Sequence, residues 1–416
     1  MKILYFHQHF KTPAQKGGTR SYEFAKQLIL RGHKVCMVYG GFSDLELPQI
    51  KKDGTKRGMI EDIEVVQFPF LYSNKDSIIE RLFKFIRFAW KGIKIALTED
   101  FDLLFATSTP LTAGIPGIVA KCFRKTKFVF EVRDLWPELP KALGMKNPFL
   151  IGGLSLLEYF CYLSADACIG LSPGICEGIK KRAGQNKPIT LIPNGCDLEV
   201  FKPAKSKDIN LKGINPTDII AVFTGAHGIA NGLDAILNAA KELKQAGRED
   251  IKLVFIGDGK LKNHLIKRSN NEGLNNCLFF DPIPKIELNK IVASADIGLM
   301  VLANVPAFYY GTSPNKFFDY ISCGLPVLNN YPGWLADMIT TNNLGIVVPP
   351  DDAVEFAKGL IRLADDCELR KTCGNNARKF AESNFSREKL SNEFVSFIEN
   401  ISQQCTKKYS NVSSIF

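Results

Sequence analysis

The feature that most constrains this chain is a repeated alternation of short apolar strands with amphipathic helices. It begins at once: residues 3–6 form the unbroken apolar run of a buried strand, residues 21–31 have helical spacing, and residues 34–39 return to a strand. A strand, a helix and a second strand in this order form a βαβ unit, and repeated units build a parallel sheet covered by helices. The chain is therefore predicted to be an α/β protein with doubly wound sheets.

The alternation runs twice along the 416 residues, which is more than one domain of ordinary size requires. Between residues 198 and 217 the composition changes to Lys, Pro, Asn, Ser and Asp, as is typical of a solvated connector. The strands expected before it are at 103–107, 127–132, 167–171 and 190–193, and those after it at 219–224, 252–257, 277–280, 297–302, 326–329 and 345–348.

These two series predict two Rossmann-like domains that face each other across a cleft. The expected bounds are 1–200 for the first domain and 201–390 for the second, with 391–416 as the end of a C-terminal helix and a polar tail. A continuous helical pattern covers residues 368–402, and we expect the C-terminal helix to pack back on the first domain.

The positive charge is concentrated in the first half of the chain. Residues 1–200 contain 28 basic and 20 acidic side chains, whereas the two kinds nearly balance in the second half. This excess indicates an anionic partner, for which nucleic acid, membrane phospholipid and a phosphorylated substrate all qualify. Because no recognition-helix motif is present, nucleic acid is not expected.

Several other classes are disfavoured. The 11 cysteines are scattered without a C-x-x-C pair, so neither a disulfide framework nor a zinc site is predicted, and a reducing cytoplasm fits best. The apolar residues 3–6 are too few for a signal peptide. The stretch 147–165 is mostly apolar, but it contains Glu158 and two glycines, so it is predicted to be a buried helix rather than a membrane span.

Three glycine-rich turns each follow an expected strand and precede an expected helix. Glycine lets the backbone approach a ligand, and the free N–H groups of the following helix attract phosphate. A plain turn is the alternative at each place, and the first turn does not have the G-x-G-x-x-G pattern of a dinucleotide site. The candidate donor-binding residues in these turns are Gly17, Gly18, Gly225, His227 and Lys260.

Two further candidates lie at strand ends of the first half. Asp134 follows the strand at 127–132, where the carboxyl edge of a parallel sheet binds ligands, and the alternative is that it caps a helix or pairs with Arg133. Asn194 lies in a tight turn before the second series, and a purely structural turn and a donor contact explain it equally well.

The segment 310–320 opens a helix whose first turn exposes amide donors. A cation at a helix start faces an unfavourable dipole, so its presence there indicates a nearby anion. A carboxylate one turn later could accept hydrogen bonds from sugar or ribose hydroxyls, and an ion pair between the two side chains is the alternative. The candidates are Ser313, Asn315, Lys316 and Asp319.

The expected helix at 78–97 has a basic face opposite an aromatic-rich arc of Leu82, Phe83, Phe85, Ile86, Trp90 and Ile93. This pattern is typical of a helix at a membrane surface, and a core-facing helix with a solvated basic rim is the alternative. The candidate membrane contacts are Arg81, Lys84, Arg87, Trp90, Lys91 and Lys94.

Together these motifs resemble glycosyltransferase family 4 of the GT-B fold. The resemblance rests on GGTR at 17–20, IPNG at 192–195 and CGLPV at 323–327. More narrowly, DLWPE at 134–138 and SPNKFFDY at 313–320 are similar to the O-antigen and capsule transferases of the WbuB type.

The resemblance implies transfer of a sugar from a nucleotide diphosphate with retention of configuration and without a metal. Asp319 then matches an acidic residue expected to hold ribose, while the family's first acidic position falls on Gly311. The Arg and Lys that usually hold the diphosphate fall on Ala226 and Asn231, so Lys316, Lys260, His227 and backbone amides are the candidates for that role. Asp134 matches the region beside the reacting sugar, where Arg133 replaces the usual His.

The sequence thus predicts a glycosyltransferase with Asp134 and Lys316 as catalytic residues and no metal or cofactor. The expected donor is a nucleotide sugar, UDP-linked and carrying an N-acetylamino sugar, and the expected acceptor is a polyprenyl diphosphate-linked saccharide of O-antigen or capsule synthesis. The expected location is the cytoplasm, peripheral on the inner face of the plasma membrane. The alternatives are a nucleotide-sugar epimerase or hydrolase on the same fold, and a non-catalytic nucleotide-sugar-binding subunit.

Overall fold

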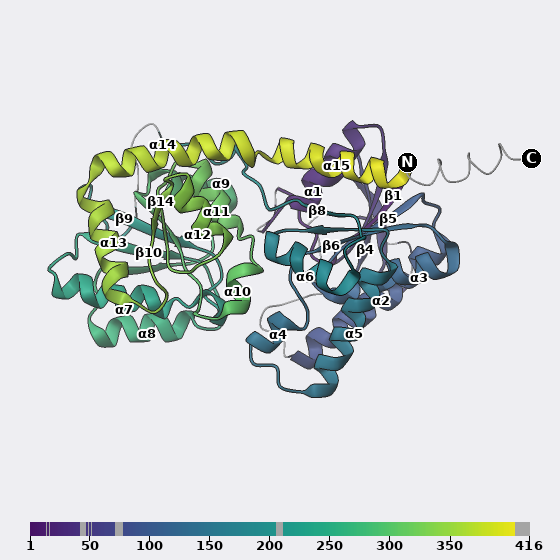
Figure 1. Ribbon diagram of the computed structural model, residues 1–416, viewed down its shortest axis with the longest axis horizontal. Coiled ribbons are helices and arrows are strands. Elements are labelled where there is room, and N and C mark those ends of the chain that lie inside the picture. Colours follow the sequence, from purple (N-terminus) through teal and green to yellow (C-terminus); the bar gives the residue numbers. More distant parts are fainter. Residues whose placement is uncertain are drawn as a thin grey trace, which may run out of the picture. The chain divides into compact units, whose positions relative to one another are not determined.

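The chain folds into two compact α/β units (Figure 1), which confirms the expected fold class. The computed structural model describes residues 1–13, 15, 17–41, 47–48, 50, 52–70, 78–204 and 211–403. Unit 1 comprises Met1–Ala14, Gly18–Pro193 and Glu388–Phe416, and unit 2 comprises Gln15–Gly17 and Asn194–Arg387.

Unit 1 contains an eight-stranded sheet in the order β3-β4-β2-β1-β5-β6-β7-β8, parallel except where β3 pairs antiparallel with β4. Its elements are β1 (Lys2–Phe6), α1 (Arg20–Leu30), β2 (Lys34–Gly40), β3 (Lys56–Ile60), β4 (Ile63–Phe68), α2 (Ile78–Thr98), β5 (Leu103–Thr107), η1 (Leu111–Gly114), α3 (Ile115–Arg124), β6 (Lys127–Val132), α4 (Glu138–Ala142), α5 (Pro148–Ser164), β7 (Ala167–Gly170), α6 (Pro173–Ala183), β8 (Ile189–Leu191) and α15 (Arg387–Gln403).

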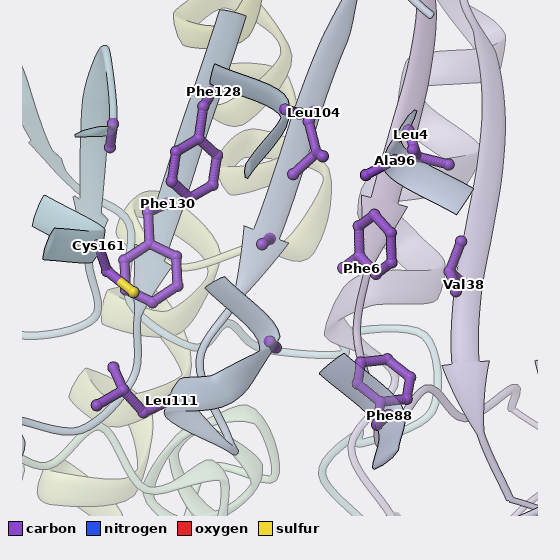
Figure 2. Close-up of a cluster of buried hydrophobic side chains, with 14 of the residues drawn as sticks. Leu4, Phe6, Val38, Phe88, Ala96, Leu104, Leu111, Phe128, Phe130 and Cys161 are labelled. Atoms are coloured by element: carbon purple, nitrogen blue, oxygen red, sulfur yellow. The ribbon is translucent and has the colours of Figure 1, made fainter. Parts of the chain in front are cut away.

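The core of unit 1 explains why its central strands are apolar on both sides. Phe6 of β1 packs against Phe88 of α2, and Phe130 of β6 lies beside Cys161 of α5, as Figure 2 shows. Helices cover the faces of a parallel sheet, so β1, β5 and β6 bury every side chain or nearly so.

The antiparallel hairpin of β3 and β4 was not expected from the sequence. β3 is an edge strand that includes Lys56, Arg57 and Gly58 and leaves four of its five residues partly or fully exposed. An edge strand needs no continuous apolar run, so the hydrophobic pattern that identifies buried strands is missing here.

The C-terminal helix α15 packs on unit 1, as expected. The ring of Phe394 stacks on Phe24 of α1 with centroids 4.1 Å apart and contacts Phe105 of β5 at 5.0 Å. The expected continuous helix over 368–402 is wrong in one respect, because α14 ends at Asn384 and α15 begins at Arg387.

Unit 2 contains a six-stranded parallel sheet in the order β11-β10-β9-β12-β13-β14. Its elements are β9 (Ile219–Thr224), η2 (Ile229–Asn231), α7 (Asp234–Gln245), β10 (Ile251–Ile256), α8 (Lys262–Glu272), β11 (Cys277–Phe280), α9 (Lys285–Ser294), β12 (Ile297–Met300), α10 (Pro306–Tyr310), α11 (Asn315–Ser322), β13 (Val327–Asn329), α12 (Trp334–Thr341), β14 (Gly345–Val347), α13 (Ala353–Asp365) and α14 (Cys367–Asn384).

The helix break at residues 385–386 joins the two ends of unit 2. The N–H of Cys196 donates to the carbonyl of Phe385 at 2.6 Å, and the N–H of Arg387 donates back to the carbonyl of Cys196 at 3.0 Å. The carboxylate of Asp197 then pairs with Arg387 at 3.0 Å and with Lys285 at 2.8 Å. These contacts hold the first and last residues of unit 2 side by side.

The helix α5 is not the buried helix that its composition predicts. Only its face toward Glu158, Cys161 and Tyr162 is buried, while large apolar side chains on the other face are exposed. In the part of the chain that the structure describes, no helix is both long and apolar enough to span a bilayer.

Candidate active-site residues of the two units

In each sheet the strand order changes direction at one point. β1 lies between β2 and β5 in unit 1, and β9 lies between β10 and β12 in unit 2. Parallel sheets bind ligands in the crevice outside the carboxyl ends of such strands. The segments that follow β9 and β12 are therefore brought together, and with them Gly225 and Lys316.

Lys316, in the first turn of α11, reaches the turn that follows β9. Its Nζ lies 3.8 Å from the centre of the Phe223 ring and donates to Oδ1 of Asn231 at 3.0 Å. A Cβ atom on Gly225, which has φ +135°, would lie 3.3–3.4 Å from Cε and Nζ of Lys316. Burial lowers the pKa of Lys316 to about 7, because the half-buried ammonium has lost water without gaining a carboxylate from the described part of the chain.

Asp319, one turn later on α11, has a different electrostatic environment. Burial raises its pKa to about 6, while Lys285 and Arg387 act to lower it. Lys316 is not among the groups that shift this pKa, and its own hydrogen bond goes to Asn231. The alternative of an ion pair between Lys316 and Asp319 is therefore wrong for this structure.

Asn194 is buried and holds the loop that precedes α11. Its backbone N–H donates to Oγ of Ser313 at 3.0 Å, and its Nδ2 donates to the carbonyl of Ser313 at 2.5 Å. Its Oδ1 is buried and has no hydrogen-bond partner among the described residues. Asn194 thus positions Ser313, while Asn315, the exposed first residue of α11, contributes the helix N-terminus.

The glycines after β10 are explained by the packing of one turn on another. A Cβ on Gly257 would lie 1.8 Å from the carbonyl oxygen of Gly225, and one on Gly259 would lie 2.4 Å from that of His227. The N–H of His227 donates to the carbonyl of Asp258 at 2.9 Å. The two turns therefore need glycine even without a ligand.

His227 is fully buried, which argues against the donor contact predicted for it. Its ring lies among Phe223, Phe255 and Phe279 with centroids 6.2–6.3 Å apart, and neither ring nitrogen has a hydrogen-bond partner among the described residues. Burial, with Lys262 as a lesser cause, lowers the pKa of His227 to about 4, so the imidazole is neutral near pH 7. Lys260, in contrast, is exposed at the start of the next turn.

In unit 1, Asp134 lies just beyond β6 and is half-buried. Thr109 donates a long hydrogen bond of 3.4 Å to its Oδ2, and burial raises its pKa against the opposing charge of Arg133. Thr109 has φ +108°, a conformation that a β-branched residue rarely adopts and that is found preferentially at functional sites. These features are compatible with a functional role for Asp134, which stays a prediction.

The loop that carries Asp134 is supported from behind by α5. Oε1 of Glu158 accepts a hydrogen bond from the N–H of Trp136 at 2.8 Å, and its Oε2 pairs with Arg182 at 3.0 Å. Burial raises the pKa of Glu158 to about 7. In the sequence Glu158 was read only as a charge that disfavours a membrane span, although an acidic residue within an apolar helix also indicates a buried partner.

A second buried carboxylate, Glu131 at the end of β6, was also missed. It pairs with Arg20 at 2.9 Å and accepts a hydrogen bond from Thr107 at 2.6 Å. Arg20 also donates to the carbonyls of Ile192 at 2.7 Å and of Pro193. The arginine of the GGTR motif therefore holds residues 192–193 at the end of the continuous part of unit 1. The sequence signal for this buried pair was the acidic Glu131 within the otherwise apolar run 127–132.

Gly17 and Gly18 precede α1, which begins at Arg20 beside these buried charges. Gly17 has φ +130°, so a residue with a side chain would be strained there. Lys16, which precedes them, lies outside the described residues. The turn keeps the conformational freedom that a close ligand approach requires.

The basic residues of α2 differ in their surroundings. Lys91 is mostly covered and pairs with Asp53 at 2.6 Å, so its charge is already compensated and the membrane contact predicted for it is not supported. Arg87 and Lys94 are exposed, as is Trp90, whereas Arg81 and Lys84 are half-buried. The exposed face of α2 is therefore mixed rather than uniformly basic.

Within the described residues, no group of three or more His, Cys, Asp or Glu side chains could hold a metal ion. Among the described residues, Lys316 reaches the turn after β9, and Lys262 acts on the pKa of His227 in that turn.

Two family models match consecutive parts of the chain. The model described as Glycosyltransferase Family 4 matches residues 17–200, and the model described as Glycosyl transferases group 1 matches residues 204–380. Each match falls largely within one of the two units.

Two curated relatives match over most of their length. A probable glycosyltransferase, WbjE, of Pseudomonas aeruginosa is 26% identical over 77% of this chain and 80% of its own. An N-acetylgalactosamine-N,N'-diacetylbacillosaminyl-diphospho-undecaprenol 4-alpha-N-acetylgalactosaminyltransferase of Campylobacter jejuni is 25% identical over 81% of this chain and 87% of its own.

Solved structures share the fold at low identity. Sucrose-phosphate synthase from Thermosynechococcus elongatus covers 96% of this chain and 98% of its own, with a TM-score of 0.76 at 18% identity. Anabaena HepE in complex with UDP and glucose covers 96% of this chain and 100% of its own, with a TM-score of 0.67 at 15% identity.

Proposed function

The chain belongs to the group 1 and family 4 glycosyltransferases, and we propose that it transfers a sugar with retention of configuration from a nucleotide diphosphate to a lipid-linked saccharide. The proposed donor is UDP-linked and carries an N-acetylamino sugar. The proposed pathway is the synthesis of a cell-surface polysaccharide such as O-antigen or capsule.

The observation that carries the donor side of this proposal is the position of Lys316. The sequence leaves Ala226 and Asn231 where the family usually has the Arg and Lys that hold the diphosphate. The ammonium of Lys316 lies 3.0 Å from Oδ1 of Asn231, which supports the proposal that this lysine of α11 takes over the role of the missing one. A desolvated ammonium without a carboxylate partner is suited to an incoming diphosphate.

The chemistry follows from this arrangement. As the bond between sugar and diphosphate breaks, negative charge develops on the leaving phosphate, and Lys316 and the N-terminal amides of α11 stabilise it. The acceptor hydroxyl attacks from the same face, and the leaving phosphate oxygen takes its proton. Because Lys316 supplies the positive charge, the proposed transfer requires no metal or cofactor.

Two carboxylates, one in each unit, have further proposed roles. Asp319 accepts hydrogen bonds from the ribose hydroxyls, and Lys285 and Arg387 help to keep it ionised despite its burial. Asp134 accepts a hydrogen bond from the acceptor hydroxyl and orients it. Ser313 and Asn315 contact the donor through the loop that Asn194 fixes.

The acceptor and the donor sugar are inferred from a relative. The Campylobacter enzyme, by its name, adds N-acetylgalactosamine to a saccharide on diphospho-undecaprenol. UDP as the nucleotide is supported by the HepE complex. We propose the same classes of donor and acceptor for this chain.

A polyprenyl-linked acceptor places the enzyme at a membrane surface. We propose that α2 contacts the inner face of the plasma membrane through Arg87, Trp90 and Lys94, with Arg81 and Lys84 near the headgroups. The enzyme is then cytoplasmic and peripheral. Substituting Glu for Arg81, Lys84 and Arg87 should weaken flotation with anionic vesicles.

The test of the function is a mass-spectrometric screen of nucleotide sugars against short-chain polyprenyl diphosphate-sugar acceptors. A product heavier by one sugar identifies donor and acceptor together, and NMR of its anomeric proton gives the configuration. Lys316→Met, which keeps the length of the side chain, should lose the product. Release of free sugar without transfer to any acceptor would contradict the proposal, as would donor binding without turnover.

A further inference from the structure

The helix α5 presents a continuous apolar face to solvent. Four large apolar side chains lie on one side of the helix, because the last three follow the first by 7, 11 and 14 residues. They are Phe149, Leu156, Phe160 and Leu163. Phe149 is 88% exposed and Leu156 is 56% exposed. Monomeric proteins rarely expose a helix face of this kind unless it contacts a partner or a membrane.

The helix α2 presents a similar face. Phe83, Ile86, Trp90 and Leu97 are all exposed and follow the same helical spacing. The other side of α2 is buried, where Phe88 and Ala96 point into the core, as does Cys161 of α5 (Figure 2). α3 contacts both helices and exposes Phe123, so apolar side chains lie on three neighbouring helices of unit 1.

Both exposed apolar faces have cations nearby. The helix α2 contains five Lys or Arg and one acidic residue, Glu80, in its first turn. Lys141, Lys146 and Leu143 are exposed in the segment that leads into α5. The acidic Glu138 and Glu158 on either side of that segment both pair with Arg182. Exposed aromatic rings beside an excess of cations match the interface of an anionic bilayer.

The chain also leaves the sheet for the two helices at the same edge. β4 and β6 run in the same direction, and α2 comes after β4 while α4 and α5 come after β6, whose carboxyl end is next to Asp134. Glu158 of α5 accepts the N–H of Trp136 at 2.8 Å, which ties α5 to the loop that carries Asp134. The position of α5 therefore sets the position of that loop.

We propose that α5 is a second membrane-docking helix, which together with α2 brings the carboxyl edge of the eight-stranded sheet against an anionic bilayer. The lipid-linked acceptor then reaches Asp134 directly from the membrane surface. This inference rests on the proposed transfer to a lipid-linked saccharide.

The first test is flotation of the full chain with phosphatidylglycerol-containing vesicles and with phosphatidylcholine vesicles. The double variant Phe149→Ser, Leu156→Ser should bind anionic vesicles about tenfold more weakly, because two apolar side chains no longer enter the interface. Ile286→Ser, at a 70% exposed position on α9 of unit 2, is the matched control and should bind as the wild type does. Undiminished flotation of the double variant would overturn the inference.

A second test measures where α5 lies. In a Trp90→Phe background, Trp substituted for Phe149 should shift its fluorescence to the blue and be quenched by brominated lipids. Trp substituted for Ile286 should do neither. If the double variant instead changes the oligomeric state without vesicles, the face is a protein interface and the inference is wrong.

The two proposals fail in different ways. Transfer to a short-chain, water-soluble acceptor should be equal in the wild type and the double variant, whereas transfer to an acceptor embedded in vesicles should fall in the double variant. Absence of transfer by the wild type would overturn the function, and the flotation result would still decide the role of α5.

Discussion

The ammonium group of Lys316 lies 3.8 Å from the centre of the Phe223 ring. The ring face attracts the cation but solvates it far less well than water, so the protonated form is destabilised. Burial accordingly lowers the pKa of Lys316 to about 7, close to neutrality. An anion that binds there would stabilise the protonated form, so binding and protonation of Lys316 are coupled.

This coupling predicts that donor affinity depends on pH. If only the protonated lysine binds the diphosphate, affinity should fall by about tenfold for each pH unit above the pKa of about 7. Calorimetric titration with UDP on both sides of that pKa measures the change. Lys316→Arg keeps its charge throughout and should bind UDP equally at both pH values, whereas a wild type without pH dependence would contradict the coupling.

His227 provides a test of burial against ligand contact. Because both of its buried ring nitrogens lack partners among the described residues, His227→Phe should leave donor affinity unchanged and leave stability unchanged or raised. The pKa of His227 in the folded protein, about 4, lies below the ordinary value of 6.5. The stability that the neutral, buried ring contributes is therefore fully present above pH 6.5 and is lost as the pH falls toward 4. The loss amounts to about 3 kcal/mol in the free energy of unfolding.

Urea unfolding of the wild type and of His227→Phe at pH values from 6.5 down to 4 checks this prediction. The wild type should lose more stability than the variant over that range, since the carboxylates that also titrate there are common to both proteins. A large drop in UDP affinity in the variant would instead support the contact between His227 and the donor that the sequence predicted.

The sequence predicted the fold because the apolar residues of buried strands and of amphipathic helices recur at different intervals. That difference is visible in the sequence of almost every element of both units. It failed at β3, an edge strand without an apolar run, and at Phe385, where helical spacing continues through a break. It also failed for α5, because apolar composition shows that a face avoids water but not whether another element covers it.

The candidate site was predictable as far as topology determines it. Asp134 and Lys316 follow strands, so their positions at carboxyl edges could be expected. The pairing of Arg20 with Glu131 joins residues 111 positions apart, and no local pattern indicates which charges will meet. In the same way, helical spacing suggested a pair of Lys316 with Asp319, and only the tertiary structure directs Lys316 to Asn231.

The buried pair of Arg20 and Glu131 should be important for the stability of unit 1. Glu131→Gln keeps the shape but leaves the guanidinium without a counterion, which should cost about 3 kcal/mol in the free energy of unfolding. Denaturant unfolding followed by tryptophan fluorescence in a Trp334→Phe background reports on unit 1, which holds Trp90 and Trp136.

The matched control is Glu177→Gln, which breaks an exposed pair with Lys180 and should leave the free energy of unfolding nearly unchanged. Equal effects of the two substitutions would show that the buried pair has no special importance.

Asp319 should recognise ribose through its ionised form. Asp319→Asn should weaken UDP binding by about tenfold or more, since hydrogen bonds to a carboxylate are stronger than those to an amide. With a pKa of about 6, the wild type should also bind UDP more weakly as the pH falls below 6, and the variant should not. Affinities for 2′-deoxy and 3′-deoxy analogues provide the check, because the wild type should discriminate against them and the variant should not.

Asp134 should affect the transfer step without affecting donor binding. Asp134→Asn keeps the size of the side chain but removes its charge and replaces one accepting oxygen by an NH2 donor, so the acceptor hydroxyl is held less well and kcat should fall by about a hundredfold. Because burial raises the pKa of Asp134, the acid limb of the wild-type pH profile should lie higher than for an ordinary aspartate. The exposed neighbour Glu138, substituted by Gln, is the control and should leave kcat unchanged. Wild-type turnover by Asp134→Asn would remove Asp134 from the reaction, and a loss of UDP affinity would place it in donor binding instead.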